Sequence, residues 1–307
     1  MIDHLISKFE RERRNSVRTR PGKGRKKKVR YDQMQLDLRE PSSHDGSGER
    51  DPLFISSLSK GLSVLQCFGD AWEGLSLKEI SQRSELTMAG AQRAVHTLTK
   101  LGYLRKDGRT RRYQLAARIL DFTYRYMRSS PLYEMAIPVV IGLRDETQET
   151  VNISLLDDTM AVLLIRMPSH RRVNPSSVIG RRMPSYAVST GRAILSRLDD
   201  RERSALLDRI SFEKVTSRTL VDRAAIETEI AKARDLGYSL VVEQAELGEM
   251  ALAAPILDGD GRPVAALGIT TSTAYWKPEE LSEKLAPLVI RAAKMISRSL
   301  QGWREIA

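Results

Sequence analysis

Five basic side chains fall within a stretch of eight residues, RKDGRTRR at positions 105–112. They are Arg105, Lys106, Arg109, Arg111 and Arg112. Like charges so close together repel one another unless an anion compensates them, and the phosphates of a nucleic acid are suitable anions. The cluster therefore predicts a phosphate-binding surface, and a solvated basic loop is the alternative.

The segment that precedes this cluster, LTMAGAQRAVHTLTKLGYL at 86–104, has the pattern of a helix. Thr87 can cap its start, and Gly102 suits a cap at its end. Apolar residues recur along it at spacings of three and four. The side chains that we expect to pack inward are Ala91, Val95, Leu98 and Leu101.

The other side of this helix carries groups that can contact double-stranded DNA. Gln92 and Arg93 are the main candidates for hydrogen bonds to bases or phosphates, and Thr87 is a candidate for a phosphate. Gly90 is a poor helix former, so we interpret it as clearance for DNA. The residues predicted to lie at or near the groove-facing side are Thr87, Met88, Ala89, Gly90, Gln92, Arg93 and His96.

Further helices must position this segment. A helical pattern begins at Leu58 and ends before Gly69. A second helix starts where Ser76 and Glu79 form a capping-box signature, and it ends near Arg83. Two helices joined by a short turn, here SELT, describe a helix-turn-helix, whose second helix lies in the DNA major groove.

The basic cluster itself falls in a predicted hairpin. Residues 103–105 and 111–115 alternate like two strands, and Asp107-Gly108 between them is a hairpin signal. A hairpin directly after a helix-turn-helix is a wing. This context favours phosphate contacts over a merely solvated loop.

Charge and composition divide the chain. The net charge is +11, of which residues 1–50 carry +6, residues 51–115 carry +4 and residues 116–307 carry +1. Residues 1–52 have few apolar positions, and we expect a disordered basic tail. Its basic cluster at 20–30 could clamp phosphates or be solvated. A winged helix-turn-helix DNA-binding domain is expected over 53–115, a linker helix over 116–130 and a larger domain over 131–307.

The linker segment 117–129, ARILDFTYRYMRS, is amphipathic. A lone helix of this composition would expose a large apolar area, so it must pair with another subunit or pack on the larger domain. We favour pairing, because helix-turn-helix proteins commonly read two half-sites as dimers. The sequence thus predicts a homodimer.

The larger domain has the pattern of an α+β fold with a mainly antiparallel sheet. Strands are predicted at 151–157, 160–167, 238–243, 249–258 and 262–272. Helices are predicted at 131–149, 189–198, 199–210, 224–237 and 278–300. Strands joined as hairpins with helices gathered around them favour this class.

The sequence lacks the residue patterns that a metal site, an enzyme or a membrane protein would require. The four histidines are scattered, and Cys67 lies in an apolar run, so we predict no metal site, no cofactor and a buried thiol. VSTGR at 188–192 is not a nucleophile elbow, and no Gly-rich phosphate loop follows a strand, which disfavours an enzyme. No apolar run is long enough for a membrane helix, and no signal peptide is recognised, so we expect a cytoplasmic protein.

The order of several stretches resembles the IclR family of bacterial transcription regulators over about residues 53–304. The matching stretches are SLSKGLSVLQCF, LSLKEISQRSELT, RAVHTLTKLGYLRKDG, YQLAARILDF, LLIRMPSHRR, IGRRMPSYAVSTGRAIL and LGEMALAAPILDGDGRPVAALGIT. The resemblance implies an N-terminal winged helix-turn-helix, a dimerising linker helix and a GAF-like effector domain. It also implies promoter binding as dimers or dimers of dimers, modulated by a small organic acid. The chain is most similar to the branch that regulates aromatic-acid catabolism.

The resemblance places the effector near SYAVSTGR and GEMALAAP. Ser189, Thr190 and Gly191 match the loop that holds the ligand carboxylate in the family. Alternatively, Ser189 or Thr190 simply caps the following helix. Ala251 and Val241 replace polar residues of other members, which suggests a more apolar effector or a decayed site.

Two further side chains are candidate effector contacts. Met183 and Tyr186 would suit an aromatic or alicyclic acid, and core packing explains them equally well. In an alternative interpretation, the larger domain is only an oligomerisation module.

Overall fold

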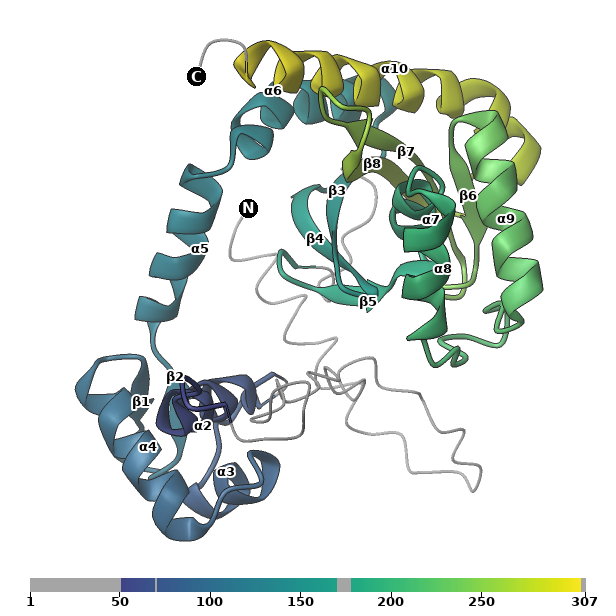
Figure 1. Cartoon of the computed structure of the whole chain (residues 1–307). Coiled ribbons are helices and arrows are strands. Elements are labelled where there is room, and N and C mark those ends of the chain that lie inside the picture. Colours follow the sequence, from purple (N-terminus) through teal and green to yellow (C-terminus); the bar gives the residue numbers. More distant parts are fainter. Residues whose placement is uncertain (1–50, 70, 170–177, 305–307) are drawn as a thin grey trace, which may run out of the picture. The chain divides into compact units, whose positions relative to one another are not determined.

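The computed structural model describes residues 51–69, 71–169 and 178–304 (Figure 1). The predicted basic tail lies almost entirely outside these residues. The N-terminal described part contains three helices and a small hairpin. They are α2 (Ser56–Gln66), α3 (Leu77–Arg83), α4 (Met88–Lys100), β1 (Leu104–Lys106) and β2 (Tyr113–Leu115).

The predicted caps of these helices are confirmed. The Ser76 hydroxyl accepts the Glu79 backbone N–H, and the Glu79 carboxylate accepts the Ser76 N–H in return, which forms the capping box at the start of α3. The Thr87 hydroxyl accepts the Gly90 N–H at 3.1 Å and caps α4. Gly102 follows α4 with a φ of +80°, a left-handed conformation that favours glycine.

The apolar pattern predicted the helices better than it predicted their buried faces. Ala91, Val95 and Leu98 are buried as expected. Leu101 is 50% exposed, so the prediction for it is wrong: α4 ends at Lys100, and Leu101 already belongs to the turn that leads to Gly102. The buried side chains of this small core are Val64, Cys67, Phe68, Leu75, Ile80, Ala91, Val95, Leu98 and Leu104.

The wing exists, but its loop is longer than Asp107-Gly108. β1 and β2 pair in an antiparallel arrangement with Lys106 opposite Tyr113. Asp107 organises the loop between them, because its carboxylate accepts the backbone N–H groups of Arg109 and Thr110. Arg111 has a φ of +59°, so the left-handed residue of this loop is an arginine and not Gly108.

A short 3-10 turn, Ala117–Ile119, leads into the linker helix α5 (Leu120–Arg128). The Arg118 guanidinium donates a hydrogen bond to the Leu101 carbonyl at 2.8 Å and lies over the Tyr103 ring. Phe122 stacks on the same tyrosine ring, with a centroid distance of 5.6 Å. The start of α5 is thus attached to the end of the predicted recognition helix.

The C-terminal part is an α+β unit built on a six-stranded sheet with the order β5-β4-β3-β8-β7-β6. All neighbouring strands are antiparallel, as predicted. The strands are β3 (Thr150–Asp157), β4 (Met160–Met167), β5 (Arg182–Pro184), β6 (Ser239–Val242), β7 (Glu249–Leu257) and β8 (Pro263–Ser272). The short edge strand β5 was not predicted.

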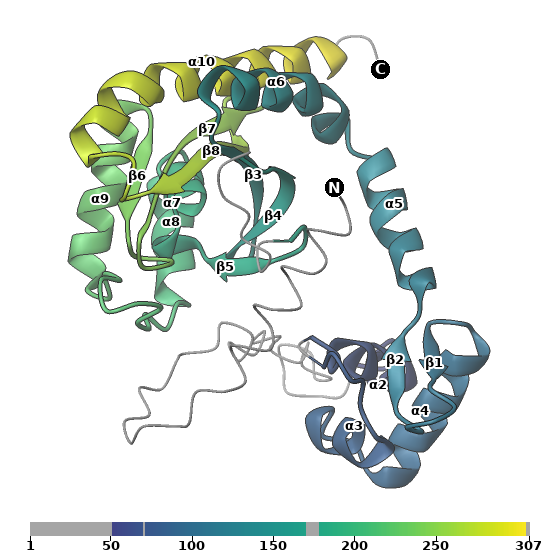
Figure 2. The ribbon, with the colours of Figure 1, turned by 180° about the vertical axis from the view of Figure 1, so that it is seen from behind.

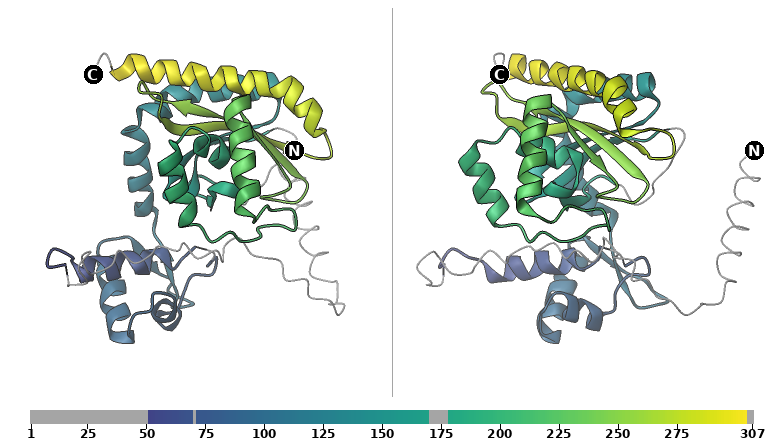
Figure 3. Two further views of the ribbon diagram at one scale, coloured as in Figure 1. Left: turned by 45° about the vertical axis from the view of Figure 1, so that its right-hand side comes forward. Right: turned by 90° about the vertical axis from the view of Figure 1, so that its right-hand side faces the viewer.

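Helices cover both faces of this sheet (Figures 2 and 3). α6 (Pro131–Thr147) and α10 (Pro278–Arg304) pack on one face. α7 (Ser189–Leu195) packs on the other face, with α8 (Asp200–Asp208) and α9 (Arg223–Leu236) beside it. These helices lie where the sequence pattern predicted them.

Alternation along the strands separates two environments. Val151, Ile153, Leu252 and Ile269 are buried in the main core that α6 and α10 complete. The neighbouring positions point to the α7 face, because successive side chains of a strand alternate between faces. Several of these are polar, which is unusual for buried strands and marks the place of the pocket.

Candidate DNA-binding surface and effector pocket

The predicted groove-facing residues of α4 are at the surface. Thr87, Met88, Ala89, Gln92, Arg93 and His96 are exposed, and Gly90 is half-buried. They lie away from the buried stripe Ala91–Val95–Leu98 of the same helix. Gln92 and Arg93 therefore have the exposure that contacts with base edges require.

Gly90 has a role within the helix as well. A Cβ at this position would lie 3.2 Å from the Thr87 hydroxyl oxygen, which accepts the Gly90 N–H. The Thr87 hydroxyl would have to move slightly, so the lack of a Cβ at Gly90 leaves room for the cap. Its proposed second role, clearance for DNA, stays a prediction.

Four of the five basic wing residues are exposed: Arg105, Lys106, Arg109 and Arg111. The Lys106 ammonium lies 5.0 Å from the centre of the Tyr113 ring, which holds the lysine stem along β2. The exposed Arg105 lies on β1, and the exposed Arg109 lies in the loop that Asp107 organises.

Arg112 is the exception, and its predicted phosphate contact is not supported. Its guanidinium binds both carboxylate oxygens of Glu79, at 2.8 and 2.7 Å, and donates to the Gly74 carbonyl at 3.0 Å. Through these contacts, Arg112 joins the wing to α3. This charge-assisted pair gives Arg112 a structural role in the winged domain.

Glu79 carries a pH dependence that can be measured. Hydrogen bonds from Ser76, followed by the Arg112 guanidinium, lower the pKa of Glu79 from 4.5 to about 2. The resulting stabilisation is present above about pH 4.5 and is lost as the pH falls toward 2. Because the Glu79 side chain is 40% exposed, solvent screening limits its ion pair to about 1 kcal/mol.

We therefore expect Glu79→Gln to lower the free energy of unfolding around α3 by about 1 kcal/mol at pH 7. The difference from the wild type should shrink as the pH falls to 2 and below, because Glu79 then becomes protonated in the folded state as well as in the unfolded state. Hydrogen exchange of the α3 and α4 amides in urea measures this. A difference that is constant with pH would contradict the assignment.

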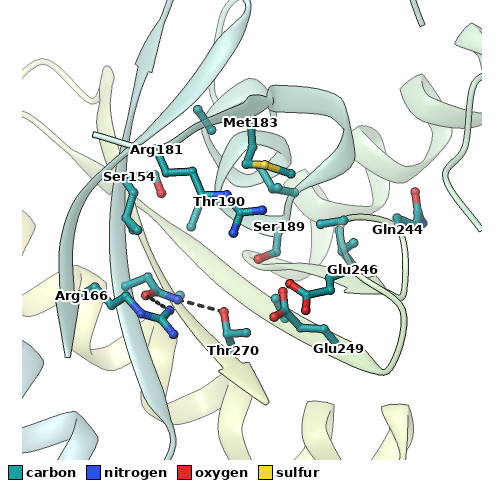
Figure 4. A pocket seen from close by; sticks show the side chains of 18 residues that line it. Ser154, Arg166, Arg181, Met183, Ser189, Thr190, Gln244, Glu246, Glu249 and Thr270 are labelled. Atoms are coloured by element: carbon teal, nitrogen blue, oxygen red, sulfur yellow. Dashed lines mark hydrogen bonds between the residues drawn. The ribbon is translucent and has the colours of Figure 1, made fainter. Parts of the chain in front are cut away.

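The second candidate site is a pocket on the α7 face of the sheet (Figure 4). Its volume is about 100 Å³, whereas one water molecule requires roughly 10–15 Å³. Apolar side chains, among them Leu163, Met183, Val188, Val241 and Ala251, form part of its wall. The polar and charged lining residues are Asn152, Ser154, Arg166, Arg181, Ser189, Thr190, Gln244, Glu246, Glu249 and Thr270.

A β-bulge brings Arg166 into this pocket. Along β4, Ala161 and Leu163 line the pocket, so regular alternation would turn Arg166 to the other face. The ladder between β3 and β4 shifts register here: Ser154 pairs with Leu163, but Ile153 pairs with Ile165. The extra residue reverses the alternation and aligns Arg166 with Asn152.

Arg166 begins a row of polar side chains across three strands. Its guanidinium donates to the Asn152 side-chain oxygen at 3.2 Å, and the Asn152 amide donates to the Thr270 hydroxyl at 2.8 Å (Figure 4). Burial lowers the pKa of Arg166, and the negative charge of Glu249 opposes this shift. The row offers a fixed cation and hydrogen-bonding groups to a ligand.

The wall opposite the strands is held by a buried arginine. Arg192 of α7 has no exposed surface, and burial lowers its pKa to about 10. It donates to the Tyr186 carbonyl at 2.7 Å and to the Gln244 side-chain oxygen at 2.6 Å. Gln244 lines the pocket, so Arg192 ties the helix and the loop 243–248 together.

Four of the six predicted effector residues line the pocket: Met183, Ser189, Thr190 and Ala251. Tyr186 does not, because its ring packs against Phe212 and its hydroxyl donates to the Glu213 carbonyl at 2.7 Å. Gly191 does not line it either. A Cβ on Gly191 would lie 2.7 Å from the Ser185 carbonyl carbon, so this glycine serves close packing.

The alternative prediction, that Ser189 or Thr190 caps α7, is wrong. The residue at the cap position of α7 is Val188, and no side chain caps that helix. Ser189 and Thr190 therefore keep their place in the pocket wall without a capping role. Sequence reasoning missed Asn152, Ser154 and Thr270, although polar residues that alternate with buried apolar ones in a strand were a usable signal.

The described residues also bear on Cys67, on metal sites and on membrane helices. Cys67 is buried as predicted, and burial raises the pKa of its thiol. Over residues 51–69, 71–169 and 178–304, no three His, Cys, Asp or Glu side chains gather as a metal site would require. No helix in these ranges is long and apolar enough to cross a membrane.

A helix-turn-helix with a basic wing, joined in one chain to an α+β unit with a small-molecule pocket, defines a DNA-binding transcription regulator. Two family models match the chain: "IclR helix-turn-helix domain" over residues 57–108 and "Bacterial transcriptional regulator IclR C-terminal" over residues 124–298. The chain belongs to the IclR family.

Similar proteins point to the aromatic branch of this family. The chain is 32% identical to the Pca regulon regulatory protein of Pseudomonas putida over 82% of its length and 86% of that protein. It is 29% identical to the p-hydroxybenzoate hydroxylase transcriptional activator of Acinetobacter baylyi, over 81% and 93%. An IclR homologue of Microbacterium hydrocarbonoxydans, solved with 4-hydroxybenzoate, has the same fold, with a TM-score of 0.68, 22% identity and coverage of 80% and 98%.

Proposed function

We propose that this regulator binds a two-fold operator as a homodimer and that a small aromatic acid in the pocket changes its promoter binding or activity. The single observation that carries the effector assignment is the polar row of Arg166, Asn152 and Thr270 beside apolar walls. A cation with fixed geometry suits a carboxylate, and apolar walls suit a ring. Relatives that regulate aromatic pathways support the same class of ligand.

The proposed domains follow the sequence divisions: a winged DNA-binding domain over 53–115, a linker over 116–130 and an effector domain over 131–307. Side chains of the linker support its role in dimerisation. Leu120, Phe122, Tyr124 and Tyr126 are each more than half exposed in the single chain. Such an apolar surface is expected to be covered by a second copy, and a dimer of dimers would require a further interface.

DNase footprinting upstream of the protein's own gene, with and without benzoate and 4-hydroxybenzoate, tests the regulator as a whole. Two protected half-sites about one helical turn apart are expected for a dimer. Titration calorimetry of the same acids with the full chain tests the effector domain. Failure of a broad panel of aromatic acids to bind would leave that domain as an oligomerisation module. The absence of an enzymatic activity is part of the same proposal.

Substitutions in the wing can distinguish residues that contact phosphate from residues that stabilise the winged domain. We expect Arg105→Ala or Arg109→Ala to weaken binding to all DNA sequences and to lower the slope of log K against log salt by about 1. Arg112→Ala should instead destabilise the winged domain by about 1 to 2 kcal/mol, because it breaks the pair with Glu79.

Fluorescence anisotropy at several salt concentrations measures the slope, and hydrogen exchange of the α3 amides measures the stability. If folded Arg112→Ala protein lost one unit of salt slope, Arg112 would contact phosphate after all. If Arg105→Ala and Arg109→Ala both kept the wild-type slope, the wing would have no phosphate contact at these positions.

A further inference from the structure

The charged side chains of the pocket are separated by sign. Arg166 and Arg181 lie on one side, from β4 and the segment before β5, whereas Glu246 and Glu249 lie on the other (Figure 4). All four are half-buried. The two carboxylates come from the loop after β6 and from the first residue of β7, close to Ser189.

Because of this separation, the two ends of a bound ligand would face side chains of opposite charge. A carboxylate is attracted to the end with Arg166, whose guanidinium donates to the Asn152 side-chain oxygen. The far end of the same molecule then faces Glu246 and Glu249. Charges in a partly buried site interact more strongly than in water, so a second anionic group would be repelled there.

The carboxylates can still accept hydrogen bonds from a ligand. Glu246 and Glu249 each have contacts within the chain, and an ionised carboxylate has about four acceptor sites. A hydroxyl or ammonium group donates to such an acceptor, and a bare apolar end leaves it without that donor. The pocket thus discriminates among acids by the group opposite their carboxylate.

We propose that Glu246 and Glu249 determine effector specificity: they select monocarboxylic acids with a hydrogen-bond donor at the far end and reject dicarboxylic acids. This inference rests on the proposed effector function of the pocket. It goes beyond that function because it assigns the discriminating residues and the chemistry that they recognise. The ligand carboxylate is assigned to the Arg166 end of the pocket, so it does not use Glu246 or Glu249.

Four acids that share a benzoate core and differ in the group opposite the carboxylate test the proposal. They are benzoate, 4-hydroxybenzoate, 4-(aminomethyl)benzoate and terephthalate, and their binding to the full chain is measured by calorimetry. We expect the hydroxyl and ammonium compounds to bind at least about tenfold more tightly than benzoate, because hydrogen bonds to charged groups are strong. Terephthalate should bind more weakly than benzoate. This ranking is measured on the wild type and needs no variant.

Glu249→Gln and Glu246→Gln keep the shape of the side chain and remove its charge. Each should reduce the preference for 4-(aminomethyl)benzoate over benzoate by about tenfold and should improve terephthalate binding. Glu134→Gln, which removes an exposed charge on α6, is the matched control and should keep the wild-type ranking. Thermal melting verifies that each variant is folded.

The outcomes distinguish the two proposals. If all four acids bind with equal affinity, or if folded glutamine variants keep the ranking, the acidic wall does not determine specificity, while the effector pocket stands. If none of the four acids binds to the wild type, both the aromatic-acid effector and its specificity residues are overturned.

Discussion

Gly191→Ala is expected to destabilise the C-terminal unit by about 3 kcal/mol or more. The new methyl group would lie 2.7 Å from the Ser185 carbonyl carbon, and its other nearest neighbours are also backbone atoms of Ser185. Backbone atoms cannot turn away as a flexible side chain can. The 3-10 turn Ser185–Ala187 and α7 would have to separate, and the pocket wall made by Ser189 and Thr190 would move with them.

Thermal unfolding of the full chain measures this effect. A loss of about 3 kcal/mol lowers Tm by roughly 6 to 12 °C in a unit of this size. Gly142→Ala is the matched control, because nothing lies within 4 Å of a Cβ on Gly142 in the middle of α6. That variant should gain up to about 1 kcal/mol from helix propensity. An unchanged Tm for Gly191→Ala would contradict the packing role of this glycine.

Arg93→Ala is expected to weaken operator binding by about 1 to 3 kcal/mol per half-site, or about 5- to 150-fold. The side chain is exposed on the recognition helix beside Gln92, where it can form two hydrogen bonds with one base. A dimer would lose this contact twice. Binding to unrelated DNA should change much less, so the specificity ratio should fall.

Lys100→Ala is the control for the loss of a positive charge, because Lys100 is exposed on the last turn of the same helix. It should weaken operator and unrelated DNA alike. Fluorescence anisotropy at fixed salt compares the variants on both DNA molecules. If Arg93→Ala kept the wild-type affinity for the operator, sequence recognition would have to be assigned to Gln92 or to the wing.

The elements of the fold were predictable because each has a local signal. Capping at Ser76 and Thr87 marks two helix starts, period-two alternation marks β3, and a short apolar run marks β4. Which face a short helix buries depends on its neighbours. Leu58 and Leu62 form a regular apolar stripe and are nevertheless half or more exposed, while Val64 is buried. The three-residue strand β5 is too short to show a period.

The candidate site was predictable only where the chain is regular or resembles the family. Met183, Ser189, Thr190 and Ala251 were placed correctly in the pocket wall. Arg166 was missed because a bulge reverses the alternation of β4, and nothing in the sequence LLIRM announces it. The pairing of Arg112 could not be predicted because its partner Glu79 is 33 positions away, and a pattern of charges cannot show which one is already paired.

The contact of Arg118 and Phe122 with the end of the recognition helix has a mechanical consequence. Arg118 holds the Leu101 carbonyl, and Tyr103 stacks with Phe122, so a twist at the start of α5 is passed to α4 and is not absorbed by a loose joint. At its other end α5 is followed by Ser129 and Ser130, and the Ser130 side chain caps α6. We therefore expect α5 and α4 to move together, so that a rotation of α5 would also turn the groove-facing side chains of α4.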